Sequence, residues 1–177
     1  LLERLTRTFK DVGYEGASLA ALSDATGLKK SSLYHRFPDG KAQMAQEAMA
    51  ETARVLDAEV FPLLAAEGAP ADKIGAFVRV MDGFYAGGRQ SCLLNMLQPP
   101  RDEANACGDA IATTFQRLLT ALGAVAREAG ADDIEAKLRA EQVLVELQGS
   151  LVVARGVGDA AIFGRALGRL PSIILDG

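Results

Sequence analysis

Residues suited to metal binding, disulfide bonding or nucleophilic catalysis are scarce in this chain. Its 177 residues include one histidine, His35, two cysteines, Cys92 and Cys107, and no tryptophan. Two widely separated cysteines with one histidine supply neither a disulfide framework nor the ligands of a zinc site. The sequence does not indicate a catalytic centre, because it has neither a nucleophile paired with a base nor a phosphate-binding glycine loop after a strand. We therefore predict reduced thiols, no metal, no cofactor and no enzymatic activity.

Long apolar segments are also missing. No run reaches the roughly 18 residues that cross a bilayer, and no signal peptide with basic, apolar and small-residue regions opens the chain. We therefore expect a cytoplasmic protein that does not contact a membrane. Because the chain starts at Leu1 rather than at methionine, we also expect that an N-terminal extension is missing.

Positive charge is concentrated near the N-terminus. The chain has a net charge of −4, with seven Lys and Arg against six Asp and Glu in residues 1–50, and twelve against seventeen in residues 51–177. Residues 28–41 alone hold four positive charges and one negative charge. An acidic protein with one basic segment is expected to bind nucleic acid through that segment only.

Residues 18–41 have the pattern of two short helices joined by a tight turn. Ser18 can accept a hydrogen bond from an amide at a helix start, and Gly27 can take the left-handed conformation that ends a helix. On the second helix Leu33 and Phe37 share one face, which leaves the opposite face exposed. Such a pair is typical of the DNA-binding helix-turn-helix, whose second helix enters the major groove. Helical hairpins with a glycine turn also occur in other all-α proteins.

A wider set of positions extends this pattern on both sides. It runs Phe9-x-x-x-Gly13-Tyr14-x-x-x-Ser18-Leu19 and then Gly27-Leu28-x-x-x-x-Leu33-Tyr34-x-x-Phe37-Pro38. Together these residues resemble the N-terminal signature of the TetR/AcrR family of transcriptional regulators, over residues 1–49. The segment Phe37-Pro38-Asp39-Gly40-Lys41 has one residue more than the family's commoner Phe-x-x-Lys, and in this it resembles the LmrA-type branch.

The resemblance implies which side chains contact DNA. Base edges or their vicinity are assigned to Lys30, Ser31 and His35. Phosphates are assigned mainly to Tyr34, Arg36, Ser18 and Lys41. The full predicted DNA-binding set is Ser18, Lys29, Lys30, Ser31, Ser32, Tyr34, His35, Arg36 and Lys41. Arg36 has an alternative role, because its position on the helix leans toward the buried side, where its aliphatic stem can pack.

Glycine and proline residues divide the chain into helices, and no strand-like alternation is present. We expect a first helix that ends at Gly13 and a long helix that begins at Gly40 and is bent or ended at Pro62. Later helices are expected near residues 70–87, 91–98, 102–129, 133–156 and 159–170, the last one stopped by Pro171. The predicted class is all-α, with a three-helix helix-turn-helix domain in residues 1–45 and a larger helical ligand-binding and dimerisation domain in residues 46–177.

The expected helix at 133–156 carries two apolar stripes. One contains Leu138, Val145 and Val152 with Gly149 and Gly156, and the other contains Leu144, Leu147 and Leu151. A helix with two apolar faces either lies at the centre of its own fold or gives one face to another subunit. With the family resemblance, we predict a two-fold homodimer through Val145, Gly149, Val152, Gly156, Phe163 and Leu167.

The larger domain also has more aromatic and methionine side chains than a thin helical layer needs. We predict that they form an apolar pocket with a few polar groups, although they can equally be ordinary core. The predicted ligand-binding residues are Phe61, Phe77, Met81, Phe84, Tyr85, Met96, Phe115, Gln116 and Glu146. The resemblance implies a lipophilic or aromatic small-molecule effector.

These inferences together predict a ligand-responsive transcriptional regulator. We expect a repressor that binds a palindromic operator in double-stranded DNA as a dimer and is released by its effector. Two alternatives are a thiol redox-responsive regulator that uses Cys92 and Cys107, and a helical small-molecule-binding protein without DNA binding.

Overall fold

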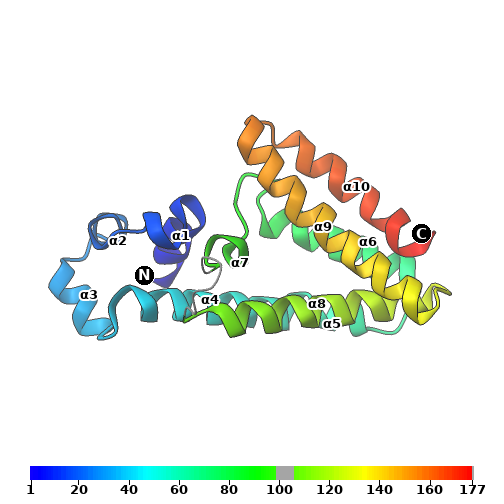
Figure 1. Ribbon diagram of the computed structural model, residues 1–177, viewed down its shortest axis with the longest axis horizontal. Helices are drawn as coiled ribbons and strands as arrows, with labels where there is room; N and C mark the ends of the chain where they lie inside the picture. Colours follow the sequence, from blue (N-terminus) through cyan, green and yellow to red (C-terminus); the bar gives the residue numbers. More distant parts are fainter. Residues whose placement is uncertain (99–105, 177) are drawn as a thin grey trace. The chain divides into compact units, whose positions relative to one another are not determined.

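The computed structural model describes residues 1–98 and 106–176, and within these ranges every regular element is a helix (Figure 1). The all-α prediction is therefore confirmed. The chain forms two compact units: unit 1 is Leu1–Arg54 with the described part of Cys92–Thr113, and unit 2 is Val55–Ser91 with the described part of Thr114–Gly177. The domain boundary expected after residue 45 stays a prediction. No helix in the described ranges is long and apolar enough to span a bilayer.

Unit 1 is built around α1 (Leu2–Gly16), which packs against α2 (Leu19–Thr26) and α7 (Leu93–Met96). Gly13 has φ +75° and ψ 176°, so it interrupts α1 where the sequence predicted its end, although the helical segment continues to Gly16. The core of this unit contains the buried side chains of Leu5, Phe9, Leu22, Leu33, Phe37, Met44 and Leu93. Leu33 and Phe37 belong to the apolar face that the sequence predicted.

Helix α4 (Gly40–Glu59) contributes residues to both units. It ends just before α5 (Phe61–Ala65), which has Pro62 in its first turn, so the predicted interruption at this proline is confirmed. Proline is tolerated in a first helical turn because its missing N–H has no partner there. Helix α6 (Pro70–Phe84) follows and contacts α5.

Unit 2 contains α9 (Asp133–Val157) and α10 (Ala161–Leu175), which lie side by side (Figure 1), and α10 also packs against α6. Helix α8 (Gly108–Glu128) approaches α9 closely at Gly123, where an added Cβ would lie 3.7 Å from the carbonyl oxygen of Ala136. The start predicted for α8 near residue 102 lies outside the described residues.

The predicted stop of the last helix at Pro171 is wrong, because α10 continues through this proline to Leu175. Ile174, in the added turn, is fully buried. Its carbonyl oxygen accepts a hydrogen bond of 2.9 Å from Nη1 of Arg139, whose own side chain is almost fully buried. Burial and this hydrogen bond stabilise the last turn, so the loss of one N–H donor at the proline is tolerated.

Candidate nucleic-acid interface

The ends of α2 are fixed by the residues that the sequence assigned to them. Ser18 is the N-cap, and its hydroxyl oxygen accepts a hydrogen bond of 3.1 Å from the amide of Ala21. Gly27 has φ +72° and ψ 11°, and its amide donates to the carbonyl of Ser23 at 2.9 Å. A left-handed residue at this point reverses the chain direction within a few residues. These two local signals place α2 and α3 as a helix-turn-helix.

Side chains near the turn hold it to α1. The hydroxyl of Thr26 donates to the carbonyl of Leu22 at 2.7 Å, and Nη1 of Arg4 donates to the carbonyl of Thr26 at 3.2 Å. Arg4 therefore ties α1 to the last turn of α2. The hydroxyl of Ser23 in addition donates to the carbonyl of Leu28 on the other side of the turn.

Helix α3 (Lys30–Arg36) buries one side chain and exposes the rest. Leu33 is fully buried, and Phe37, which follows the helix, is 1% exposed. Tyr34 is a large side chain that remains 46% exposed although it belongs to a packed unit. The exposed side of this segment contains Lys29, Lys30, Ser31, Ser32, Tyr34 and His35. The structure thus brings these predicted DNA-binding residues together on one accessible surface, and their contact with DNA stays a prediction.

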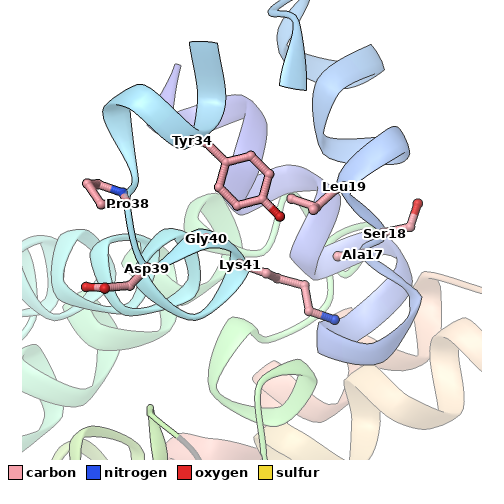
Figure 2. Close-up of a pocket in the computed structure, with 8 residues that line it drawn as sticks. All are labelled: Ala17, Ser18, Leu19, Tyr34, Pro38, Asp39, Gly40 and Lys41. Carbon is pink, nitrogen blue, oxygen red and sulfur yellow. The ribbon is translucent and has the colours of Figure 1, made fainter. Parts of the chain in front are cut away.

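A cleft of about 540 Å³ lies beside this surface (Figure 2). It is lined by Ala17, Ser18, Leu19, Tyr34, Pro38, Asp39, Gly40 and Lys41. The starts of α2 and α4 therefore both border it, and helix starts carry partial positive charge and amides without helical partners. Figure 2 shows the Tyr34 ring with its hydroxyl directed toward the side where Leu19 and Lys41 lie. This arrangement suits a small anion such as a phosphate group.

Gly40 shapes one wall of the cleft. Its φ is +65°, and an added Cβ would lie 3.4 Å from Cε1 of Tyr34. The Gly40 amide donates to the carbonyl of Phe37 at 2.9 Å, which closes the short connection between α3 and α4. The connection has one residue more than the commoner Phe-x-x-Lys pattern. It is nevertheless tight, and its left-handed position requires glycine.

Lys41 lies at the cleft but is engaged by its own protein. Its Nζ donates a hydrogen bond of 2.9 Å to the carbonyl of Tyr14 and stands 4.3 Å from the centre of the Tyr14 ring. That ring is stacked on Phe9 with 6.3 Å between the ring centres. Burial raises the pKa of the Tyr14 hydroxyl, so the ring remains neutral at physiological pH. The charge of Lys41 is therefore held in place beside the cleft rather than on a freely moving side chain.

Arg36 is turned toward α4. Its Nη2 and Nη1 lie 2.7 and 3.0 Å from the two carboxylate oxygens of Glu47. The hydrogen bond from Arg36 lowers the pKa of the Glu47 carboxyl, and the same bond raises the pKa of the Arg36 guanidinium. Sequence reasoning missed Glu47, because no local pattern joins residues that are eleven positions apart across a turn. The predicted phosphate contact of Arg36 thus competes with an ion pair inside the protein.

The predicted ligand-binding residues are divided between the two units. Phe77, Met81 and Tyr85 are buried in the core of unit 2, and Tyr85 packs edge-on against Phe163. Met96 belongs to unit 1, where its Cε would lie 3.4 Å from a Cβ on Gly13. Of the other predicted residues, four are half-buried and one is exposed: Phe61, Phe84, Phe115 and Glu146 are half-buried, and Gln116 is exposed.

Two of these residues have specific partners. Arg117 stacks on the Phe61 ring at 4.1 Å, and Arg169 binds the Glu146 carboxylate, with Nε at 2.8 Å. The carboxylate of Glu146 thus has a partner within the protein, on α10. Gln116 lines a groove of about 380 Å³ between α8 and α9, and none of the other predicted ligand-binding residues lines that groove. Ligand contact therefore stays a prediction for the whole set.

The first apolar stripe of α9 faces outward in unit 2. Val145 is 72% exposed and Val152 55% exposed, and an added Cβ at Gly149 or Gly156 would meet nothing within 4 Å. Phe163 and Leu167, in contrast, are buried within their own unit, where α10 packs against α6 and α9. They are not accessible to a second subunit, so we remove these two residues from the predicted dimer surface.

Both cysteines are buried, and burial raises the pKa of the Cys107 thiol. The thiolate is the reactive form, so its fraction at neutral pH is lower than for an ordinary cysteine. This environment does not favour the redox-responsive alternative. The described residues contain no group of His, Cys, Asp and Glu that could hold a metal ion.

The fold and this surface define a helix-turn-helix protein, and comparisons with known proteins agree with this class. Residues 1–48 match the family model of bacterial regulatory proteins of the tetR family. The regulator LmrA of Bacillus subtilis is 35% identical over 79 residues, which are 45% of this chain and 42% of LmrA. The uncharacterised regulator YxaF of the same organism is 29% identical over 79 residues, 45% of this chain and 41% of YxaF. The chain thus matches less than half the length of these curated relatives.

Solved structures share the fold over nearly the whole chain. A TetR-family regulator from Streptomyces coelicolor has a TM-score of 0.79 and 17% identity, covering 99% of this chain and 92% of that one. The TetR-family regulator CifR, a cysteine mutant in complex with operator DNA, has a TM-score of 0.77 and 22% identity, covering 99% and 94%.

Residues 1–48 therefore match the tetR family model, and the described chain shares the fold of solved TetR-family regulators. The match to the family model agrees with the resemblance predicted over residues 1–49. The match to LmrA also agrees with the branch that the connection after Phe37 indicated.

Proposed function

We propose that this protein is a transcriptional repressor of the cytoplasm that binds a palindromic operator as a homodimer and is released by a small molecule. The observation that carries the proposal is the exposed surface of α3 next to a cleft bordered by the starts of α2 and α4. Exposed polar side chains and a cleft that can accept a backbone phosphate lie together in one small helical unit, as a helix-turn-helix requires.

Within this proposal the two parts of the surface have different tasks. Lys30, Ser31 and His35 reach base edges in the major groove, where hydrogen-bonding patterns distinguish the four base pairs. Ser18, Tyr34 and Lys41 position one backbone phosphate at the cleft, with the amides at the two helix starts as additional donors. CifR, which has a similar fold, was solved with a 26 bp double-strand operator DNA, and this supports the same mode of binding.

The dimer is proposed to form through the outward apolar face of α9. This face contains Ile134, Leu138, Val145, Gly149, Val152 and Gly156, and each large side chain among them is at least half exposed. An exposed apolar stripe on a helix whose opposite face is already buried indicates a partner surface, and its glycines permit close approach of a second helix. A two-fold dimer places two α3 helices in successive major grooves, about 34–36 Å apart.

The effector is proposed to act on unit 2, where most of the aromatic residues lie. It must bind one conformation of the dimer more tightly than the other, because a ligand with equal affinity for both shifts nothing. A coupling of about 1–3 kcal/mol changes DNA affinity by about 5- to 150-fold. We expect a lipophilic or aromatic compound, since the pocket residues predicted from the sequence are mostly apolar.

Footprinting of the full chain on DNA upstream of its own gene tests the proposal. We expect protection of two inverted half-sites whose centres are separated by one helical turn, about 10 to 10.5 bp, or a multiple of it. An effector found by its release of this DNA must bind more weakly when the operator is present, by the same factor. Protection without inverted half-sites contradicts the two-fold dimer, and unequal factors contradict the linkage between effector and operator.

A further inference from the structure

A hydrogen-bonded network in unit 1 joins the end of α3 to α4. The Asp39 amide donates to Oε1 of Gln43 at 3.2 Å, and Nε2 of Gln43 donates to Oε1 of Glu47 at 3.0 Å. Both oxygens of Glu47 accept hydrogen bonds from Arg36. The network thus links α4 both to Arg36, at the end of α3, and to Asp39, in the connection between the two helices.

The guanidinium of Arg36 is held by a second contact. Its Cζ lies 4.5 Å from the centre of the Phe37 ring, and this ring is 1% exposed in the core of unit 1. The Phe37 amide donates to the carbonyl of Leu33 at 2.7 Å, which fixes the Phe37 backbone at the end of α3, and burial holds its ring. Two parallel hydrogen bonds and a ring beneath the guanidinium give Arg36 one orientation, which a single exposed ion pair does not.

We propose that Glu47 is a positioning residue for DNA binding, and that Arg36 acts through Glu47 rather than by touching DNA. The inference rests on the proposed function, because bases are read from α3 while a phosphate is held at the cleft beside the start of α4. Both sites must engage the same duplex at once. A fixed angle between α3 and α4 is therefore needed for affinity, and the pair of Arg36 and Glu47 supplies it.

The chain offers a matched control in Glu51, one helical turn further along α4. Glu51 forms a bidentate ion pair with Arg54, with distances of 2.6 and 2.8 Å, and both residues belong to α4. Glu51→Gln and Glu47→Gln therefore remove the same charge from the same helix, but only Glu47→Gln breaks a bond to α3. Since each variant removes a negative charge, electrostatics alone would strengthen DNA binding in both.

The experiment measures the affinity of full-length variants for operator and scrambled DNA over a range of salt concentrations. Glu47→Gln and Arg36→Gln are both expected to weaken operator binding, by about 3- to 30-fold for the two pairs of a dimer, with the larger loss in Arg36→Gln because it also removes a positive charge. The slope of log affinity against log salt is expected to stay unchanged in both, because no phosphate contact is lost. Glu51→Gln is expected to bind as tightly as the unchanged protein or slightly tighter.

The exchange variant Arg36→Glu/Glu47→Arg separates the two roles of Arg36. If the pair only positions α3, the exchange restores more than half of the affinity lost, on a logarithmic scale. If Arg36 contacts a phosphate, a carboxylate in its place weakens binding further, and Arg36→Gln alone lowers the salt slope by about one ion per subunit. That result overturns the inference, and so does a Glu47→Gln variant that binds like the Glu51→Gln control. In either case the proposed function stands if the unchanged protein still prefers the operator to scrambled DNA. An unchanged protein that binds both DNAs equally overturns both.

Discussion

Val145→Asp is expected to convert the protein to monomers and to lower operator affinity by about two orders of magnitude or more. Val145 is 72% exposed in the single chain and lies in the middle of the outward face of α9. In the proposed dimer a carboxylate here is buried without a partner, in two copies. Leaving a buried polar group unsatisfied costs about 1–3 kcal/mol and more when it is charged, and each 1.4 kcal/mol is a tenfold change in affinity.

Sedimentation equilibrium and operator titration, with Lys137→Gln as the control, measure this effect. Lys137 also lies on α9, and its side chain is 77% exposed beside Glu141, on the side that faces α8. Both substitutions change the net charge by −1, so a loss of DNA binding caused by charge alone appears in both. We expect the control to remain dimeric. A Val145→Asp protein that stays dimeric at micromolar concentration shows that α9 does not form the interface.

Gly88→Ala is expected to destabilise the protein by about 2–4 kcal/mol, the sum of a backbone cost and a steric cost. Gly88 has φ +85°, and an added Cβ would lie 2.5 Å from Cβ of the buried Phe163. The Cβ of Phe163 is fixed to the backbone, so a side-chain rotation cannot relieve the clash. Helix α10 must therefore move away from the turn after α6. The packing between Tyr85 and Phe163 is expected to be lost as well.

The neighbouring Gly87 isolates the backbone cost. Its φ is +63°, but the nearest atom to an added Cβ is Nη1 of Arg89 at 3.7 Å, which is ordinary contact. Gly87→Ala is therefore expected to cost about 1 kcal/mol, from the left-handed conformation alone. Urea unfolding of both variants gives the difference directly. Equal free energies of unfolding for the two variants contradict the close approach between Gly88 and Phe163.

The parts of this protein that the sequence predicted well are those that depend on neighbouring residues. The cap at Ser18, the left-handed turn at Gly27 and the interruption at Pro62 are local choices of the backbone, so residue type alone indicates them. The exposed stripe through Val145 is likewise a matter of helical periodicity. The family resemblance was predictable for the same reason, since its positions lie within the first 49 residues.

The errors and omissions concern contacts between residues far apart in the sequence. Periodicity placed Phe163 on an apolar face but did not say whether that face meets α6 or a second subunit. The sequence did not indicate a protein partner for Glu146, because Arg169 lies 23 residues away on α10. The stop at Pro171 failed since the burial of Ile174 outweighs the lost hydrogen bond. Tertiary packing decides each of these cases, and no short pattern encodes it.

The most direct test of DNA recognition by α3 is fluorescence anisotropy with DNA from upstream of the protein's own gene. The titration compares this DNA with scrambled DNA of the same composition at two salt concentrations, for the unchanged protein and for Tyr34→Ala/His35→Ala. We expect the unchanged protein to prefer the upstream DNA by about three orders of magnitude or more, and the variant to lose this preference while keeping weak, salt-dependent binding. Equal, weak binding of both proteins to both DNAs contradicts the account, because residues 18–41 then form a helical hairpin that reads no sequence.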